Sequence, residues 1–345
     1  MPDVRLNSQN ANNCQSPLSR AGGFVKVQAF AKINLFLDVV GKKNDGYHDI
    51  FSLMQTVSLC DELIISFAAK NFFEFSCDVP NLSDENNLVV RAAKILIREY
   101  DLPRGISIAL KKKIPVGAGL AGGSSDCAAT LLGINNLFGL NIPREKLASI
   151  GKSLGADVPF CLAGGTAIVE GIGEKITPLP PHPPCFIVIA VPKIFVSTAE
   201  IFKNLDAASR SFAESPRQKN QLHEKNFARE NQKKIISAFS QKNFSRSFEE
   251  SPQQKNHEKI LRALSQNSPG EIAASFYNVF TPITSSMHPQ ISDLIARFET
   301  LGALGAQMSG TGPSVFAYFD EKKTAETAFD ILKNSLEHVF LCTPI

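Results

Sequence analysis

The sequence predicts a two-domain protein of the α+β class, and three observations lead to this expectation. The chain has 345 residues, which is enough for two hydrophobic cores. The proline-rich segment PLPPHPP at 178–184 is typical of a boundary. Beyond it, the order strand, helices, hairpin, helix and strand is typical of an α+β domain.

The first domain is expected at residues 23–180. Residues 24–40 are rich in β-branched and aromatic side chains, which favours one or two strands. Apolar residues recur at helical spacing at Leu88, Ala92, Ile95 and Leu96, which predicts a helix. The remaining predicted elements are strands at 63–68, 72–76 and 106–110, a glycine-rich turn at 117–123, helices at 128–137 and 144–154, and a hairpin at 165–179.

The second domain is expected at residues 181–345, with a polar insertion at about 206–258. The insertion is dense in Ser, Gln, Asn and Lys, and SRSFAESPRQKN at 209–220 recurs as SRSFEESPQQKN at 245–256. One duplication is too little for a solenoid, so a surface excursion is expected. Around it, the pattern predicts strands at 186–191, beside 310–312 and at 338–342, and helices at 197–205, 257–264, 270–301 and 322–337.

Composition argues against several classes of protein. A net charge of +3 does not call for a nucleic-acid partner. The densest apolar run, at 186–191, is far shorter than the ~20 residues of a membrane-spanning helix. Residues 1–22 lack the apolar region of a secretory signal and are expected to form a disordered tail. Seven scattered cysteines with no C-x-x-C pair suggest neither a zinc site nor a disulfide framework. We therefore expect a cytoplasmic protein without nucleic-acid or membrane partners, as a monomer or weak homodimer.

The strongest functional signal is the segment PVGAGLAGGSSD at 115–126, which follows a predicted strand and opens a helix. Glycine lets backbone N–H groups approach an anion closely, and the helix N-terminus adds oriented donors. The segment therefore predicts a phosphate cradle, to which Ser124 and Ser125 would add hydroxyls for phosphate or Mg²⁺. It is not a Walker A loop, because no G-K-[ST] closes it. A flexible surface turn is the alternative.

Two further segments carry polar groups in apolar surroundings. Lys32 and Asn34 alternate with apolar residues in AKINLFL at 31–37, so they share one face of a strand. They could bind a ligand together or simply face solvent on an edge strand. Asp157, in LGADVPF at 154–160, lies between a helix and a strand, where it could cap the helix or act as a base.

Two loops could close over a ligand. MSGTGPS at 308–314 is a glycine-rich turn between two strands, and a plain hairpin loop is the alternative. Tyr47 and His48 follow the Lys32 strand by about ten residues, close enough to fold back beside it. Their aromatic rings could stack on a base, although surface or core packing is the usual role of such a pair.

Together these segments resemble the GHMP kinases, the family that includes galactokinase, homoserine kinase and mevalonate kinase. The matching segments occur in the order of the family and cover nearly all of 24–205 and 257–342: they are 31–59, 87–93, 114–131, 154–174 and 308–320. The resemblance implies a ribosomal-S5-like first domain, a ferredoxin-like second domain, and a kinase site between them. The tail at 1–22 and the long polar insertion depart from the family.

The resemblance also implies roles for single residues. Asp157 matches the catalytic aspartate and Lys32 its partner lysine. The nucleotide site would comprise Asn87 and Lys112, near adenine and ribose, with the loop residues Pro115, Val116, Gly117, Ala118, Gly119, Leu120, Ala121, Gly122, Gly123, Ser124 and Ser125. The substrate site would comprise Asn34, Tyr47, His48, Asp157, Gly310, Thr311 and Gly312. Ser124 or Ser125 would contact Mg²⁺.

The implied reaction is transfer of the γ-phosphate of ATP, with Mg²⁺, to a hydroxyl of a small molecule. Because phosphoryl transfer needs mainly positioning and charge stabilisation, Lys32 would stabilise negative charge while Asp157 receives or orients the hydroxyl. The rings of Tyr47 and His48 favour a substrate that carries cytidine diphosphate. Two alternatives stay open: a GHMP kinase for another alcohol, and an RNA-binding module, which would need a wide basic patch.

Overall fold

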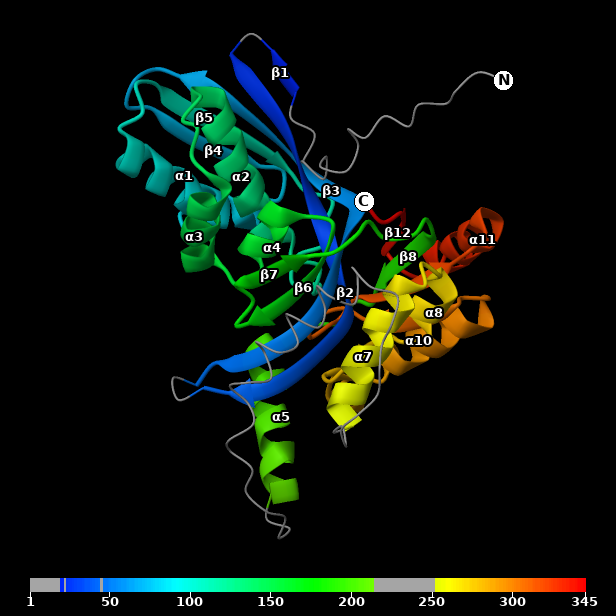
Figure 1. Ribbon diagram of the computed structural model, residues 1–345. Helices are drawn as coiled ribbons and strands as arrows, with labels where there is room; N and C mark the ends of the chain where they lie inside the picture. Colours follow the sequence, from blue (N-terminus) through cyan, green and yellow to red (C-terminus); the bar gives the residue numbers. More distant parts are fainter. Residues whose placement is uncertain (1–18, 22, 44–45, 214–251) are drawn as a thin grey trace, which may run out of the picture.

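The computed structural model describes residues 19–21, 23–43, 46–213 and 252–345 (Figure 1). Of the expected disordered tail at 1–22, Ser19–Ala21 forms a short strand, β1, which pairs with the next strand of the chain. The rest of that tail lies outside the described residues. The prediction of disorder is therefore wrong at 19–21, where backbone pairing orders the chain.

The first domain is a sheet with helices on one face (Figure 1). The long strands β2 (Phe24–Lys42) and β3 (His48–Ala68) form an antiparallel hairpin, and the sheet runs in the order β1-β2-β3-β5-β4, with β6 pairing β3 and β7 beyond it. The other strands are β4 (Phe73–Cys77), β5 (Gly105–Lys111), β6 (Thr166–Gly171) and β7 (Lys175–Pro178). The helices are α1 (Leu88–Tyr100), α2 (Gly122–Phe138), α3 (Arg144–Leu154) and α4 (Val158–Ala163), and a short 3-10 turn, η1, covers Pro80–Leu82.

The second domain contains an antiparallel sheet in the order β10-β11-β8-β12. Numbered by their order along the chain, these four strands lie in the order 2-3-1-4, which is the ferredoxin-like arrangement expected. The strands are β8 (Phe186–Val191), β10 (Gly305–Met308), β11 (Val315–Phe319) and β12 (His338–Cys342). The helices are α5 (Thr198–Ala213), α7 (Pro252–Ser265), α8 (Pro269–Ala273), α9 (Thr281–Met287), α10 (Gln290–Thr300) and α11 (Lys322–Lys333).

Strand β8 is buried on both faces and so joins two cores. Side chains alternate across a strand, and Ile187 and Ile189 pack into a core shared with the β2–β3 hairpin. Val188 and Ala190 point the other way, into a core with α10 and α11. The short strand β9 (Tyr277–Asn278) pairs in parallel with β2. The two domains therefore share one apolar core and one sheet.

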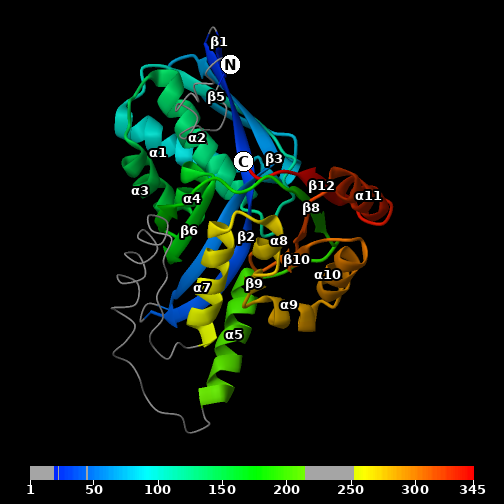
Figure 2. The ribbon, with the colours of Figure 1, turned by 45° about the vertical axis from the view of Figure 1, so that its right-hand side comes forward.

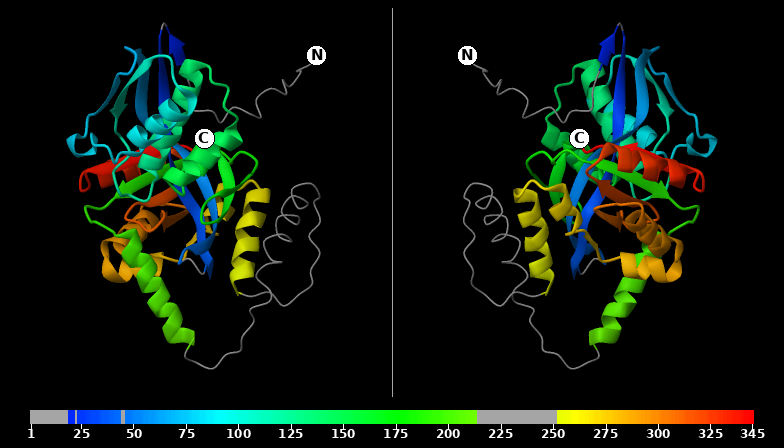
Figure 3. Two further views of the ribbon diagram at one scale, coloured as in Figure 1. Left: turned by 90° about the vertical axis from the view of Figure 1, so that its left-hand side faces the viewer. Right: turned by 90° about the vertical axis from the view of Figure 1, so that its right-hand side faces the viewer.

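The edges of the expected insertion at 206–258 are packed helices. Helix α5 projects from the body near the tip of the β2–β3 hairpin (Figures 1 and 3), and Asp206 on it contacts that hairpin. Helix α7 lies beside β2 (Figure 2), where buried His257 stacks on Phe51 with ring centroids 4.1 Å apart. His257 Nε2 also lies 3.3 Å from an oxygen of Asp38. Residues 214–251, with most of the duplicated segment, lie outside the described residues.

Several elements differ from the sequence prediction. Strand β3 begins at His48, earlier than expected, and α2 begins at Gly122 rather than 128. Helix α4 was missed, because six residues give too little apolar periodicity, although Pro159 near its start is a helix signal. The expected helix at 270–301 is broken into α8, β9, α9 and α10.

Candidate active site between the two domains

The glycine-rich loop turns the chain from β5 into α2 with three left-handed residues. Gly117 has φ +67°, Gly119 has φ +76° and Ala121 has φ +57°. A Cβ at position 119 would lie 2.3 Å from the carbonyl oxygen of Ser309. Glycine is therefore needed at 119 both for its backbone conformation and for the close approach of a second loop.

The start of α2 has the properties of an anion site. Its N-cap residue, Ala121, makes no side-chain cap hydrogen bond. In the part of the chain that the structure describes, the N–H groups of Gly122, Gly123 and Ser124 have no hydrogen-bond partner. Such N–H groups and the positive end of the helix dipole favour a phosphate.

The two serines at this helix start differ in availability. Ser125 is buried, and its hydroxyl donates to the carbonyl of Phe30 at 2.6 Å. The Ser124 hydroxyl makes no hydrogen bond to any described residue and is half-buried. Ser124 is thus the better candidate of the two for a contact with phosphate or Mg²⁺.

The loop at 308–314 binds the glycine-rich loop at 115–125, the proposed phosphate loop, from the other side. The hydroxyl of Ser314 donates to the carbonyl of Ala118 at 2.6 Å, and that of Ser309 donates to the carbonyl of Gly119 at 3.0 Å. From β2, the backbone N–H of Lys32 donates to the carbonyl of Leu120 at 3.1 Å. The loop at 308–314 and the glycine-rich loop therefore bind each other directly.

Asn34 connects these loops to the predicted catalytic lysine. Its Oδ1 accepts from the ammonium of Lys32 at 2.7 Å and from the N–H of Gly310 at 3.0 Å. Its amide nitrogen donates to the hydroxyl of Ser52 at 2.9 Å, and Ser52 donates in turn to the carbonyl of Phe36. Because Asn34 is buried, both ends of its amide need partners, and each end has one.

Lys32 and Asp157 come together as predicted from the resemblance. The ammonium of Lys32 lies 3.8 Å from Oδ2 of Asp157, and the two side chains are 5% and 33% exposed. Asp157 stands at the N-cap position of α4 but makes no side-chain cap hydrogen bond. Its carboxylate is therefore not used as a helix cap and is accessible to a ligand beside a buried cation.

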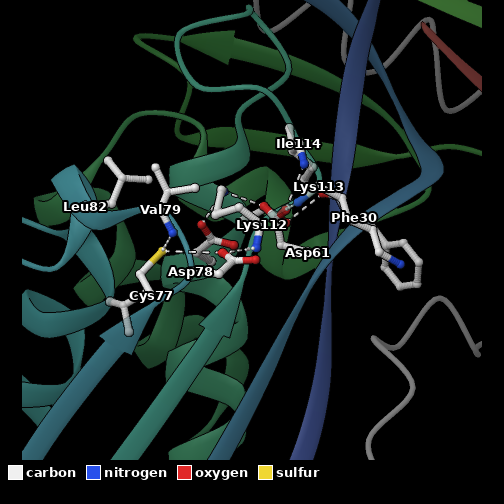
Figure 4. A network of polar contacts seen from close by, with 12 residues as sticks. Phe30, Asp61, Cys77, Asp78, Val79, Leu82, Lys112, Lys113 and Ile114 are labelled. Carbon is white, nitrogen blue, oxygen red and sulfur yellow. Dashed lines mark hydrogen bonds and ion pairs between the residues drawn. The ribbon is translucent and has the colours of Figure 1, made fainter. Parts of the chain in front are cut away.

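Asn87 and Lys112, assigned above to the adenine and ribose, have structural partners. Asn87 caps α1 by accepting from the N–H of Val89, and its amide donates to Leu82. The side chain of Lys112 is buried and pairs with Asp61 (Figure 4). Its ammonium also lies 2.6 Å from Asp126. Both side chains are therefore engaged in structural contacts, and a direct contact with nucleotide from them stays a prediction.

The acidic pair around Lys112 connects the exit of β5 to helix α2. Oδ1 of Asp61 accepts from the N–H of Ile114 at 2.8 Å and also from that of Lys113 (Figure 4). Asp126, in the second turn of α2, is buried, and its Oδ1 has no hydrogen-bond partner among the described residues. Burial raises the pKa of Asp126 to about 8, despite the attraction of Lys112.

Tyr47 and His48 do not fold back beside Lys32. His48 pairs with Lys42 across the hairpin, at the far end of β2 from the Lys32–Thr56 pair. Its ring packs on Phe202 of α5, with centroids 4.9 Å apart and planes tilted by 36°. Tyr47 is 61% exposed. His48 is far from Lys32 because β2 and β3 stay paired as far as Lys42 and His48, so the chain does not turn back near Asn34.

The expected site residues thus form two groups. The first comprises Lys32, Asn34, Asp157, the loop at 115–125 and the turn Gly310, Thr311 and Gly312, and the second comprises Tyr47 and His48. Thr311 is placed by a contact between its hydroxyl and that of Thr198, 3.0 Å away at the start of α5. Ser309 and Ser314 were inside a quoted motif but were not singled out, and no sequence signal marked Phe202 or Asp206.

The described residues contain neither a membrane-spanning helix nor a cluster of metal-binding side chains. No helix there is both long and apolar enough to cross a membrane. Nor, within the same residues, do three or more His, Cys, Asp or Glu side chains gather as a metal cluster. A Mg²⁺ ion usually keeps several waters and binds substrate phosphates with one or two protein oxygens, which the Ser124 hydroxyl and the Asp157 carboxylate could provide.

Comparison with known proteins places both domains. Residues 87–165 match the family described as "GHMP kinases N terminal domain", and residues 252–338 match "GHMP kinases C terminal". The chain is 37% identical over 322 residues to the 4-diphosphocytidyl-2-C-methyl-D-erythritol kinase of Acetivibrio thermocellus, covering 93% of this chain and 99% of that protein.

Two solved structures extend the comparison. A crystal structure of 4-(cytidine 5'-diphospho)-2C-methyl-D-erythritol kinase superimposes with a TM-score of 0.69 at 27% identity, over 92% of this chain and 98% of that one. The homoserine kinase of Cytophaga hutchinsonii gives a TM-score of 0.64 at 20% identity, over 99% and 97% of the two chains. The second likeness shows the fold alone.

The raised pKa of Asp126 gives a testable pH dependence. The unfolded carboxyl titrates near pH ~4, so between about pH 4 and 8 the folded chain holds a proton that the unfolded chain releases. Stability is therefore lost as pH rises through this range. Asn cannot ionise, so Asp126→Asn should gain on the order of 4 kcal/mol over the wild type between pH 5 and 8.5, measured by urea unfolding.

Asp61→Ala is the contrasting variant. It leaves two backbone N–H groups and Lys112 short of an acceptor, so it should cost about 2–5 kcal/mol at both pH values. Equal pH dependence in Asp126→Asn and the wild type would show that Asp126 is not the group that holds the proton.

Proposed function

The chain belongs to the GHMP kinases and, within them, to the 4-diphosphocytidyl-2-C-methyl-D-erythritol kinases, and we propose that it transfers the γ-phosphate of ATP to the 2-hydroxyl of 4-diphosphocytidyl-2-C-methyl-D-erythritol. This is a step of the non-mevalonate route to isoprenoid precursors. The observation that carries the proposal is the 37% identity to a kinase of this name over 99% of its length. The buried Lys32 beside the accessible Asp157 supplies the chemistry.

The phosphates of ATP would bind at the start of α2. The N–H groups of Gly122, Gly123 and Ser124 have no partner among the described residues, and they point from a helix end that carries partial positive charge. Mg²⁺, held by the nucleotide with the Ser124 hydroxyl, would neutralise charge on the phosphates. The loop is fixed before ligand arrives, because its carbonyls already bind Ser309, Ser314 and Lys32.

The transfer itself would be served by Lys32 and Asp157. Asp157 would accept the hydrogen of the attacking hydroxyl or orient that hydroxyl toward the γ-phosphate. Lys32 would stabilise the negative charge of the transition state. Asn34 Oδ1 accepts a hydrogen bond from the Lys32 ammonium at 2.7 Å. Lys32 is therefore already positioned and would not need to move during the reaction.

The pyrimidine would bind at the far end of the hairpin. His48 and Phe202 place two rings 4.9 Å apart, one from each domain. A flat ring system can stack on a base, at ~1–3 kcal/mol per base. The separation between this ring pair and Lys32 along β2 suits an extended substrate whose diphosphate lies between base and reacting hydroxyl, rather than a small amino acid or mevalonate.

Substrate choice tests the proposed function. With saturating ATP, kcat/KM for diphosphocytidyl-methylerythritol should exceed that for homoserine or phosphomevalonate by at least ~100-fold. ADP release gives the rates, and ³¹P NMR of the product locates the new phosphate. If the enzyme phosphorylated homoserine or phosphomevalonate well and ignored the cytidine-bearing alcohol, the substrate assignment would be wrong although the fold stands.

Asp157 and Lys32 give a second prediction. Asp157→Asn should keep ATP affinity but lower kcat by roughly 10²–10⁴, the range for general-base groups, and Lys32→Met should do similar harm. If the two act as one unit, the double variant is little worse than either single change. Stopped-flow and steady-state ADP release measure kcat.

Lys152→Met is the matched control for these variants. Lys152 forms an exposed pair with Glu174 in the same domain, at 3.5 Å, and its loss should leave kcat within about twofold, since surface pairs contribute little. Near wild-type turnover by Asp157→Asn would remove Asp157 from the catalytic role.

A further inference from the structure

Three polar side chains from both domains meet at the tip of the β2–β3 hairpin. Lys42 and His48 face each other across the hairpin ladder. Asp206 comes from α5 of the second domain and binds both: His48 Nε2 lies 2.8 Å from its Oδ1, and Lys42 donates to its Oδ2. Each carboxylate oxygen thus has one partner.

Asp206 fixes which nitrogen of the His48 imidazole carries the proton. The hydrogen bond from Lys42, with that from His48, lowers the pKa of Asp206, so its carboxylate is ionised at neutral pH. An ionised carboxylate only accepts hydrogen bonds, so the proton between the two groups must lie on Nε2. A neutral His48 then carries a lone pair on its other nitrogen, Nδ1.

One turn of α5 also fixes the plane of the ring. Phe202 and Asp206 are four residues apart, so they lie on the same side of the helix. Phe202 packs against the imidazole while Asp206 holds its Nε2. The His48 side chain is 10% exposed. Its Nδ1 has no hydrogen-bond partner among the described residues, and this atom is not fully buried.

We propose that Asp206 is a positioning residue for base recognition, holding His48 with its proton on Nε2 so that Nδ1 accepts a hydrogen bond from the amino group of cytosine. Cytosine carries an N4 amino donor where uracil carries an O4 acceptor. A lone pair on Nδ1 therefore favours cytosine and disfavours uracil. The inference rests on the proposed function, in which the substrate is a cytidine diphosphate derivative.

The test compares the cytidine substrate with its uridine counterpart, using the full-length enzyme at pH 8. Asp206→Ala should raise KM for the cytidine substrate about tenfold and reduce the cytidine-to-uridine ratio of kcat/KM by a similar factor, as for one lost hydrogen bond. KM for ATP should stay within about twofold. Asp206→Asn keeps an acceptor oxygen and should restore part of the ratio.

Two controls separate base recognition from simple docking of α5. Lys42→Met removes the other partner of Asp206 but not the contact to His48. Because an aspartate is ionised at pH 8 even without a neighbouring lysine, this variant should leave the ratio unchanged. Asp49→Asn removes a neighbouring carboxylate that pairs with Lys43 at 3.2 Å, and should do the same. An unchanged ratio in a folded Asp206→Ala variant would overturn the proposal, because Asp206 would then only anchor the helix.

A spectroscopic measurement covers the case in which Asp206→Ala does not fold. In the wild-type protein, ¹⁵N NMR of the His48 ring should show Nε2 protonated and Nδ1 unprotonated, and the opposite tautomer would overturn the proposal. Failure of the proposed function is recognised separately: the wild-type enzyme would then not phosphorylate the cytidine substrate, whatever the state of His48.

Discussion

The candidate site depends on the hydrogen bonds of one buried side-chain amide, that of Asn34. It is 1% exposed, and it binds the Lys32 ammonium, the Gly310 N–H and the Ser52 hydroxyl. Through Gly310 and the neighbouring Ser309 it connects the first-domain strand to the second-domain loop, and Ser309 reaches on to the carbonyl of Gly119. A single buried side chain therefore sets the position of the lysine and of both glycine-rich loops, and leaving such a buried group unpaired is costly.

This arrangement explains why a kinase site is built where two domains meet. Each domain supplies elements that the other completes: the phosphate loop and Asp157 come from the first, and the loop at 308–314 and helix α5 come from the second. Strand β9 and the core around Ile187 and Ile189 bind the domains together. The positive charge comes from the first domain alone, where the buried cation Lys32 and the uncapped start of α2 lie beside the place proposed for the phosphates.

Much of this could be predicted from the sequence, because glycine patterns and strand alternation are local signals. The pairing of Lys32 with Asn34 follows from period-2 alternation, and the phosphate loop follows from its glycines and the helix after it. What could not be predicted depends on contacts distant in the chain. The partners of Lys112 lie 51 and 14 residues away, at Asp61 and Asp126, and no local pattern shows that its ammonium is buried. The place of His48 depends on how long the β2–β3 ladder continues, and Asp206 lies in a segment that its composition marked as an insertion.

The most direct test of the Asn34 account is isothermal titration calorimetry of ATP and of the cytidine substrate with Asn34→Ala. Because Asn34 holds both loops and Lys32, the variant should lose roughly tenfold or more in affinity for both ligands. Asn135→Ala is the control, since the Asn135 side chain binds only the backbone of Ile142 among the residues that the structure describes, and its affinities should match the wild type. A folded Asn34→Ala variant that bound ATP as tightly as the wild type would contradict the account, because the phosphate loop would then not depend on Asn34.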